Sequence, residues 1–205
     1  RTAALRGKGK KLQTRYRYNS KHQLVAVAQY KVDDTGEPQL QSETQYQYDP
    51  LGRRVCKQGQ GITTEFLWNG DVLLQETTRD SESSQDLKSR TYYFEPETFK
   101  PVALSEDGAV YQYHLDHLGT PDTLTNAEGE VVWNVSYKTY GNLAIAHREE
   151  IAQPIRFQGQ YFDEESGLHY NRHRYFDPIA GQFTTQDPVG LLGGSNSYFY
   201  VPNPI

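Results

Sequence analysis

Asp187 is the acidic residue whose surroundings point most directly to chemistry, because it opens the run DPVG near the end of the chain. Two carboxylates around one water molecule or one peptide carbonyl can hydrolyse a bond, since the charge of one keeps the other protonated. Asp187 qualifies as one member of such a pair. The alternative is that its side chain only accepts backbone N–H groups in a turn, as Asp49 in DPLG and Asp177 in DPIAG are expected to do.

Two further groups of titratable residues could form a site. The acidic run 163–165 resembles the carboxylate pair of a glycosidase, although adjacent acids in a turn usually face solvent. His114 with His117, and His169 with His173, could supply metal ligands. On a strand, however, residues four apart are separated by about 13 Å, and no Cys or acid accompanies these pairs at a known zinc spacing. We therefore expect neither a metal nor a cofactor.

The elements that carry these residues are expected to be β-hairpins. YRYNSKHQLVAV (16–27) and YQYDPLGRRV (46–55) both contain Tyr-x-Tyr, a short turn beginning with Asn or Asp, and a return to valine. Alternate side chains of a strand share a face, so the two tyrosines of each copy lie together. A third copy, YQYHLDHLGTPDTLT (111–125), precedes a turn at 126–129 and an alternating strand from Val131 to Tyr137. The irregular spacing of the copies favours hairpin units over a strict solenoid.

A closer repeat precedes Asp187. YFDEESGL (161–168) and YFDPIAGQ (175–182) share Tyr, Asp and Gly at matching positions and predict two hairpins in series. Between them, HYNRHRY (169–175) is expected to be one strand with a basic face. Three glycines would allow tight reversals: Gly167, Gly181 and Gly190. Three aromatic residues are expected to be buried against the preceding hairpins: Tyr170, Tyr175 and Phe183.

Two segments depart from the β pattern. Residues 142–154 contain helix formers and a terminating proline, so we expect at most one short helix there. Residues 77–90 are polar and rich in turn formers, which predicts an exposed loop. Everything else is expected to be β. Hairpins so poor in aliphatic residues would gain much of their stability by stacking on neighbouring parts of a longer chain.

The composition predicts an ordered chain that is part of a longer protein. The 205 residues include 16 Tyr and 13% aromatic residues, which bury large areas, but no Met, and the chain begins with Arg1. The single Cys56 excludes an internal disulfide. No apolar run approaches the roughly 18 residues of a membrane helix, and no signal peptide is visible.

The net charge of −5 is unevenly distributed. Nine basic residues and no acidic ones lie between Arg1 and Lys31. A basic arm could bind nucleic acid, but Lys and Arg also protect exposed strand edges from unwanted pairing. We favour edge protection and expect no nucleic acid partner.

The repeats resemble those of a known family. YRYNSKHQL and YQYDPLGRRV are similar to the Tyr-Asp (YD) repeat of Rhs proteins. The segment 111–133, followed by YKTYGN, looks like a signature section of bacterial Rhs proteins. Residues 155–205 resemble the Rhs repeat-associated core, and the resemblance weakens only across 77–100.

This resemblance implies an all-β fold in which YD hairpins wind into a spiralling sheet, a hollow shell around a C-terminal toxin domain. Residues 1–141 would be hairpins of the shell wall, and residues 142–205 a core that curls inward as a plug. The implied function is to contain the toxin of a secreted bacterial effector used in interbacterial competition, commonly delivered by type VI secretion. The implied partners are the rest of the same polypeptide and delivery proteins such as a secretion spike and a chaperone.

The resemblance also implies a role for Asp187. In many Rhs proteins the core is an aspartyl autoprotease with two Asp-Pro-x-Gly motifs, and Asp187, Pro188 and Gly190 match the first one. The second Asp would lie past Ile205, so this piece alone is not expected to cleave. An alternative of a different class is a YD-repeat cell-surface protein that binds carbohydrate in adhesion. Solvent-exposed coplanar rings on the outer face would favour that alternative, and rings packed between adjacent strands would favour the shell.

Overall fold

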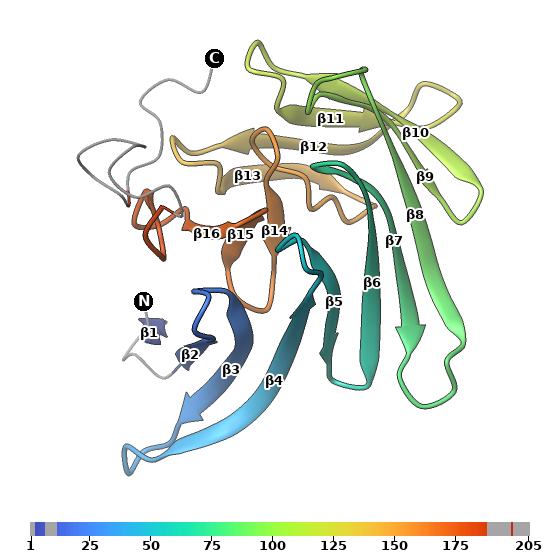
Figure 1. The fold of residues 1–205 in the computed structure, drawn as a ribbon. Helices are drawn as coiled ribbons and strands as arrows, with labels where there is room; N and C mark the ends of the chain where they lie inside the picture. Colours follow the sequence, from blue (N-terminus) through green and yellow to red (C-terminus); the bar gives the residue numbers. More distant parts are fainter. Residues whose placement is uncertain (1–2, 7–11, 188–197, 199–205) are drawn as a thin grey trace.

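The computed structural model describes residues 3–6, 12–187 and 198, and these residues form two antiparallel sheets. The larger sheet has thirteen strands, each paired with the next strand in sequence, and the smaller one has four. We call the larger sheet the wall and the smaller sheet the plug. Figure 1 shows that the wall curves around the plug. The described residues contain no helix, so the all-β prediction is confirmed, and no helix that could span a membrane was found among them.

The strands are short and closely spaced. Those of the wall are β1 (Ala3–Arg6), β2 (Leu12–Tyr18), β3 (Leu24–Val32), β4 (Pro38–Tyr48), β5 (Arg54–Gly59), β6 (Ile62–Asn69), β7 (Val72–Asp80), β8 (Asp86–Phe94), β9 (Pro101–Glu106), β10 (Ala109–Leu115), β11 (Pro121–Thr125), β12 (Val131–Tyr137) and β13 (Leu143–Glu149). Those of the plug are β14 (Tyr161–Asp163), β15 (Leu168–Asn171), β16 (Arg174–Asp177) and β17 (Gln182–Phe183).

Several wall turns share one hydrogen-bond pattern. In the turn of DPLG, the N–H of Gly52 donates to the carbonyl of Asp49, and the Asp49 side chain accepts the N–H of Arg53 at 2.9 Å. Gly52 has a φ of +81°, which suits a residue without a Cβ. The same pattern recurs with the acceptor at Asn19, Asp33, Asp116 and Asn126. The chemistry that these turns share explains why the chain forms consecutive hairpins.

β-bulges bend the wall at regular places. A register shift comes just before Tyr18, Tyr48, Trp68 and Phe94, in four different strands. Each bulge adds a residue to one strand and increases its local bend and twist. The bulges therefore contribute to the curvature of the wall around the plug.

The core lies between the concave face of the wall and the plug. It contains one tyrosine of each YD copy: the first in two copies, Tyr16 and Tyr46, and the second in the third copy, Tyr113, which are 5%, 4% and 8% exposed. The prediction that three plug aromatics are buried is confirmed for Tyr170, Tyr175 and Phe183. The positive φ expected at two plug turns is also confirmed for Gly167 and Gly181, whereas Gly190 lies outside the described residues.

Three predictions of secondary structure are wrong. Residues 142–154 form no helix, because Leu143–Glu149 pairs with β12 as strand β13. Residues 77–90 are mostly strand rather than loop, because β7 and β8 pair through Thr78 and Lys88. In both segments cross-strand pairing overrides a weak local preference. The run 169–175 is a hairpin rather than one strand: Asn171 pairs with Arg174 across a turn in which Arg172 has a φ of +49°.

The expected domain division at residues 141 and 142 does not coincide with a break between the sheets. The wall continues through β13 to Glu149, and the plug begins at Tyr161. A separate bridge between Ile155 and Tyr161 lies in the connection. As a statement about two functional domains, the division stays a prediction.

Candidate functional site

Asp187 follows the last plug strand, and its carboxylate is ion-paired. Its Oδ2 lies 2.9 Å from Nη2 of Arg174, the first residue of β16, and the two side chains are 19% and 18% exposed. The guanidinium of Arg174 lies 3.6 Å from the ring centroid of Phe183. Burial lowers the pKa of Arg174, and the Asp187 carboxylate opposes that shift. A neighbouring plug strand therefore determines where this carboxylate is held.

The rest of the DPVG motif cannot be placed, because Pro188 and Gly190 lie outside the described residues. The two other Asp-Pro turns behave as expected. Asp49 accepts the N–H of Arg53, and Asp177 accepts the N–H groups of Ile179 and Ala180 at 3.0 and 3.2 Å. Asp187 pairs with an arginine of β16, Arg174. Its catalytic role stays a prediction.

A buried ion pair joins the wall to the plug. Nη1 of Arg54, on β5, donates to Oδ2 of Asp163, on β14, and both residues are 0% exposed. Aromatic rings surround the guanidinium, whose Cζ lies 4.6 Å from the centroids of both Phe66 and Tyr170. A cation over ring faces is stabilised by the ring quadrupole. Arg54 and Asp163 therefore connect the two sheets at the centre of the core.

The turn that follows β14 is bound to the wall by further polar contacts. Glu165 accepts the Tyr46 hydroxyl at 2.8 Å, and its carboxylate lies 3.5 Å from Nζ of Lys57. Tyr16 donates to the carbonyl of Ser166 at 3.0 Å. The expectation that the acids 163–165 face solvent is thus wrong for Asp163 and Glu165, because the wall covers them.

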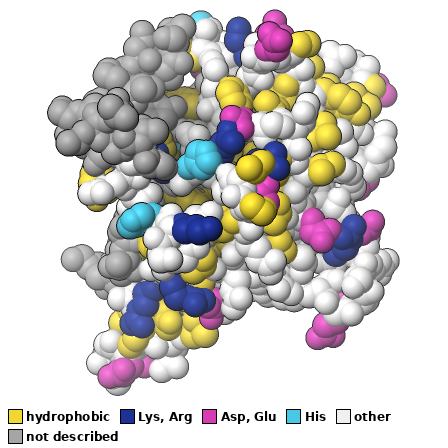
Figure 2. All heavy atoms as spheres, in the orientation of Figure 1, with side chains coloured by type: hydrophobic (Ala, Val, Ile, Leu, Met, Phe, Trp, Pro, Cys, Tyr) yellow, Lys and Arg dark blue, Asp and Glu magenta, His cyan; other side chains and the backbone are white. Residues whose placement is uncertain are grey.

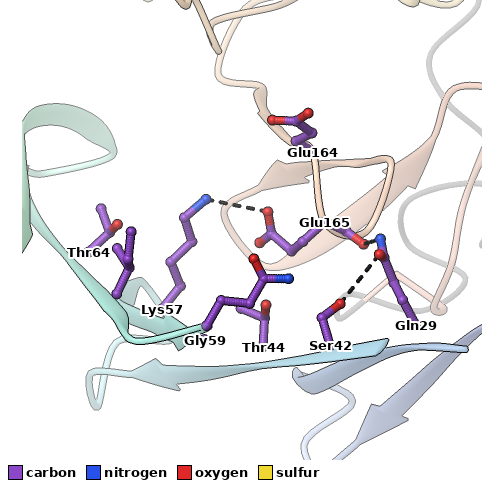
Figure 3. A pocket seen from close by; sticks show the side chains of 10 residues that line it. Gln29, Ser42, Thr44, Lys57, Gly59, Thr64, Glu164 and Glu165 are labelled. Carbon is purple, nitrogen blue, oxygen red and sulfur yellow. Dashed lines mark hydrogen bonds and ion pairs between the residues drawn. The ribbon is translucent and has the colours of Figure 1, made fainter. Parts of the chain in front are cut away.

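Figure 3 shows that Lys57 and Glu165 also border a polar cavity beside this turn. The cavity has a volume of about 570 Å³ and lies between the turn and strands β3 to β6. Its lining includes hydroxyl and amide side chains from the wall: Gln29, Ser42, Thr44 and Thr64. The wall therefore presents polar side chains to the cavity at this place.

The pKa values of Asp163 and Glu165 are shifted in opposite directions. Burial raises the pKa of Asp163, and the guanidinium of Arg54 opposes that rise. Burial also acts to raise the pKa of Glu165, but Lys57 and Arg54 outweigh it, so this pKa is lowered. Arg54 itself loses solvation, yet the Asp163 carboxylate raises its pKa and keeps it charged. The arrangement is that of an ion-pair network that joins the plug to the wall.

A second network fastens β14 to the middle of the wall. Glu76 accepts hydroxyls from Tyr161 at 2.6 Å and Tyr92 at 3.0 Å, and Arg90 lies 3.1 Å from the same carboxylate. Arg90 also pairs with Glu106 on the next strand. These buried charges are mutually compensated, as buried charges must be.

The histidines are not arranged as metal ligands. His169 is buried, with Nδ1 2.6 Å from Oε1 of Gln160, and burial lowers its pKa to about 3. His173 lies in the turn between β15 and β16, and His114 contacts Thr125 on the wall. Within the described ranges, no three His, Cys, Asp or Glu residues come together in a way that could hold a metal ion.

The basic N-terminal residues that the structure describes contact the wall itself. Arg15 lies over the ring of Tyr30, 4.3 Å from its centroid, and Arg17 lies 3.6 Å from Glu43. Figure 2 shows Lys and Arg gathered over the N-terminal strands at the lower left, with acidic side chains beside them and mixed charges elsewhere. Both arginines lie on β2, which is paired with β1 and β3, so edge protection stays a prediction.

Comparison with known proteins connects this architecture to a family. A family model described as "RHS protein" matches residues 110–146, across β10 to β13. "Double-stranded DNA deaminase toxin A" of Burkholderia cenocepacia is 33% identical over 98% of the chain, and "Toxin protein Tse5" of Pseudomonas aeruginosa is 33% identical over 92%. The chain belongs to the Rhs family. It spans only 16% of the length of each of these two relatives, which are much longer polypeptides.

The fold of this Rhs chain is shared with a solved toxin complex. The crystal structure of TcdB2-TccC3 without its hypervariable C-terminal region matches 93% of the chain with a TM-score of 0.70. The sequences are 21% identical, and the match covers 10% of that longer chain. The wall and plug therefore form part of a curved β-shell with an inward core, as the sequence predicts.

Sequence reasoning found Asp187 but missed the residues that hold it and the plug. Arg174 was only part of an expected basic face, and Arg54 lay unassigned in the repeat YQYDPLGRRV. Nothing in the local sequence distinguishes Arg174 from a surface arginine. For Arg54 the one local signal is that a charged residue lies in a repeat whose ring residues are buried.

Proposed function

We propose that this Rhs segment is part of a shell that encloses a toxin domain of the same polypeptide. The observation that supports the proposal best is a curved wall whose concave face holds its own plug and, beside the turn after β14, a cavity lined by polar side chains such as Gln29 and Ser42. A polar inner surface suits containment, because it would not bind an enclosed chain tightly through apolar contacts. The toxin names of the long relatives agree with this role.

The finer parts of the proposal follow the family resemblance. Residues 1–141 would act as shell wall and residues 142–205 as the core that ends the shell. The complete protein would be a secreted bacterial effector in interbacterial competition, handed to a type VI spike by a chaperone. The carbohydrate-binding alternative has less support, because Tyr16, Tyr46 and Tyr113 are buried and cannot stack on a sugar.

We also propose that Asp187 takes part in self-cleavage of the longer chain at the end of the core. Arg174 would hold the Asp187 carboxylate in one position, while a second Asp from beyond this chain would complete the pair. A charged carboxylate beside a neutral one is the arrangement needed to activate a water for attack on a peptide carbonyl.

The first test is self-cleavage of the longer protein that carries this segment. The change is Asp187→Asn, and Asp49→Asn is the matched control, because Asp49 opens the similar motif DPLG and its carboxylate is also paired with an arginine, Arg53 of its own turn. On a denaturing gel, the unmodified protein and the control should each give two bands and Asp187→Asn a single one. Under native gel filtration the two fragments should elute together. Release of the toxin band by Asp187→Asn would show that the catalytic role is wrong, and separate elution would refute containment.

A further inference from the structure

Arg54 is a wall residue that contacts three of the four plug strands. Its Nη1 donates to Asp163 on β14 and lies 3.2 Å from the Tyr175 hydroxyl on β16. Its backbone N–H donates to the Tyr170 hydroxyl on β15 at 2.8 Å. Trp68 on the next wall strand donates to the Arg54 carbonyl at 2.7 Å and so braces the arginine from the other side.

Tyr175 connects this contact to the ion pair of Asp187. It directly follows Arg174 on β16, and neighbouring side chains of a strand point to opposite faces. When the wall holds Tyr175 on one face, Arg174 must project from the other, where it meets Asp187. The carbonyl of Tyr175 also accepts the N–H of Thr184 at 2.8 Å, which ties the segment leading to Asp187 to the same strand.

We propose that Arg54 is a positioning residue for the cleavage at the end of the core. By binding Asp163 and Tyr175 together, it seats β16 on the wall and thereby sets Arg174 against Asp187. The proposal rests on the proposed function of Asp187. Its consequence is an order of events: β5 must be part of a folded wall before the pair can align, so the chain is cut only after the shell that holds the toxin has formed.

The chemistry of the contact requires an arginine. The guanidinium presents several N–H groups in a planar fork and stacks on rings, so one residue can serve a carboxylate, a hydroxyl and two aromatic faces. Lysine would keep the positive charge but would have neither the planar set of N–H donors nor a planar group to stack on the rings. Tyr48 of the wall also binds the Tyr175 hydroxyl, at 3.1 Å. Two wall side chains therefore hold β16 in place through this one hydroxyl.

Two tyrosine-to-phenylalanine variants of the longer protein separate positioning from general stability. Tyr175→Phe removes the hydroxyl that Arg54 and Tyr48 bind on β16. Tyr161→Phe is the matched control: its hydroxyl is also buried and bound to the wall, at Glu76, but it lies on β14, away from Arg174. We expect Tyr175→Phe and Arg54→Lys to slow self-cleavage by about tenfold or more, because small misplacements of reacting groups have large effects on rate. Tyr161→Phe should cleave within about twofold of the unmodified protein.

The readouts are the first-order rate constant of band appearance, its pH profile and the urea midpoint of each variant. A positioning role predicts that self-cleavage of Tyr175→Phe is slower at every pH, with the pH profile unshifted. It also predicts that Tyr175→Phe cleaves more slowly than Tyr161→Phe even though the two variants have similar urea midpoints. If the unmodified protein is not cleaved, the proposed function is wrong and this inference falls with it. If it is cleaved, and both tyrosine variants slow only in proportion to their loss of stability, the positioning role alone is wrong.

Discussion

At the scale of single residues, the interior of this chain is organised by paired polar groups as much as by apolar ones. Arg54, Asp163 and Glu76 are each at most 5% exposed and are each bound by partners from other strands. Tyrosine suits such an interior, since its ring buries area while its hydroxyl still finds an acceptor. His169 also has a polar partner, Gln160, but its ring is packed against Phe162 and Phe176, and burial lowers its pKa.

The buried neutral His169 predicts a loss of stability in acid. Burial lowers its pKa from 6.5 to about 3 in the folded chain, with the charge of Arg156 adding to the shift. Between these values the unfolded state binds the proton and the folded state does not, so the free energy of unfolding falls as pH falls below 6.5. We expect this residue to cost about 2 kcal/mol by pH 5. Urea titrations across pH measure the slope, which should flatten in His169→Gln and persist in the exposed control His114→Gln.

At the scale of elements, the wall is a series of hairpins specified mainly by their turns. An Asn or Asp side chain accepts two backbone N–H groups, and a residue with positive φ follows three positions later. In the first YD copy that later position is His22, with a φ of +60°, which shows that the side-chain acceptor can hold the turn without glycine. Strand propensity matters less, as β13 forms from a segment rich in helix formers.

The turn at Asn126 offers a direct test of this element. Its Oδ1 accepts the N–H groups of Glu128 at 3.1 Å and Glu130 at 2.8 Å. Asn126→Ala should lower the free energy of unfolding by about 1 kcal/mol, because two amides lose their acceptor at the surface. Glu128→Ala, in the same turn, leaves both bonds in place and is the control. Hydrogen exchange of the two amides checks the assignment, and equal protection in the two variants would contradict it.

At the scale of the whole molecule, the plug is docked into the wall by contacts that only the folded wall can present. The charged centre Arg54–Asp163 lies among rings from both sheets, and Trp68 of the wall packs 5.8 Å from the ring of Tyr170. Burying two charges gains little over a well-packed apolar pair but makes the loss of one partner costly. Such a contact favours a single position of the plug on the wall.

Removing one partner of the buried pair should therefore harm the molecule more than removing both. Asp163→Leu leaves the Arg54 charge buried without its carboxylate and should cost about 3 to 5 kcal/mol. Arg54→Met combined with Asp163→Leu should recover much of that loss, because no buried charge remains. Urea unfolding followed by the fluorescence of the two tryptophans, Trp68 and Trp133, would measure the four states of this cycle. A double variant as unstable as the sum of the single ones would show that the two residues are not coupled.

The sequence by itself determined the all-β class, the turns at Asp49 and Asn126, and the two plug hairpins, though not the turn at 172–173 between them, because turn chemistry and side-chain alternation act over a few residues. It also singled out Asp187, through a motif. Only the tertiary structure decided that Asp163 and Glu165 are covered, that Arg174 holds Asp187, and that β13 extends the wall. Arg54 and Asp163 are 109 positions apart in the chain. Their contact exists only because the bent wall returns to enclose the plug, a matter of long-range packing that no local pattern records.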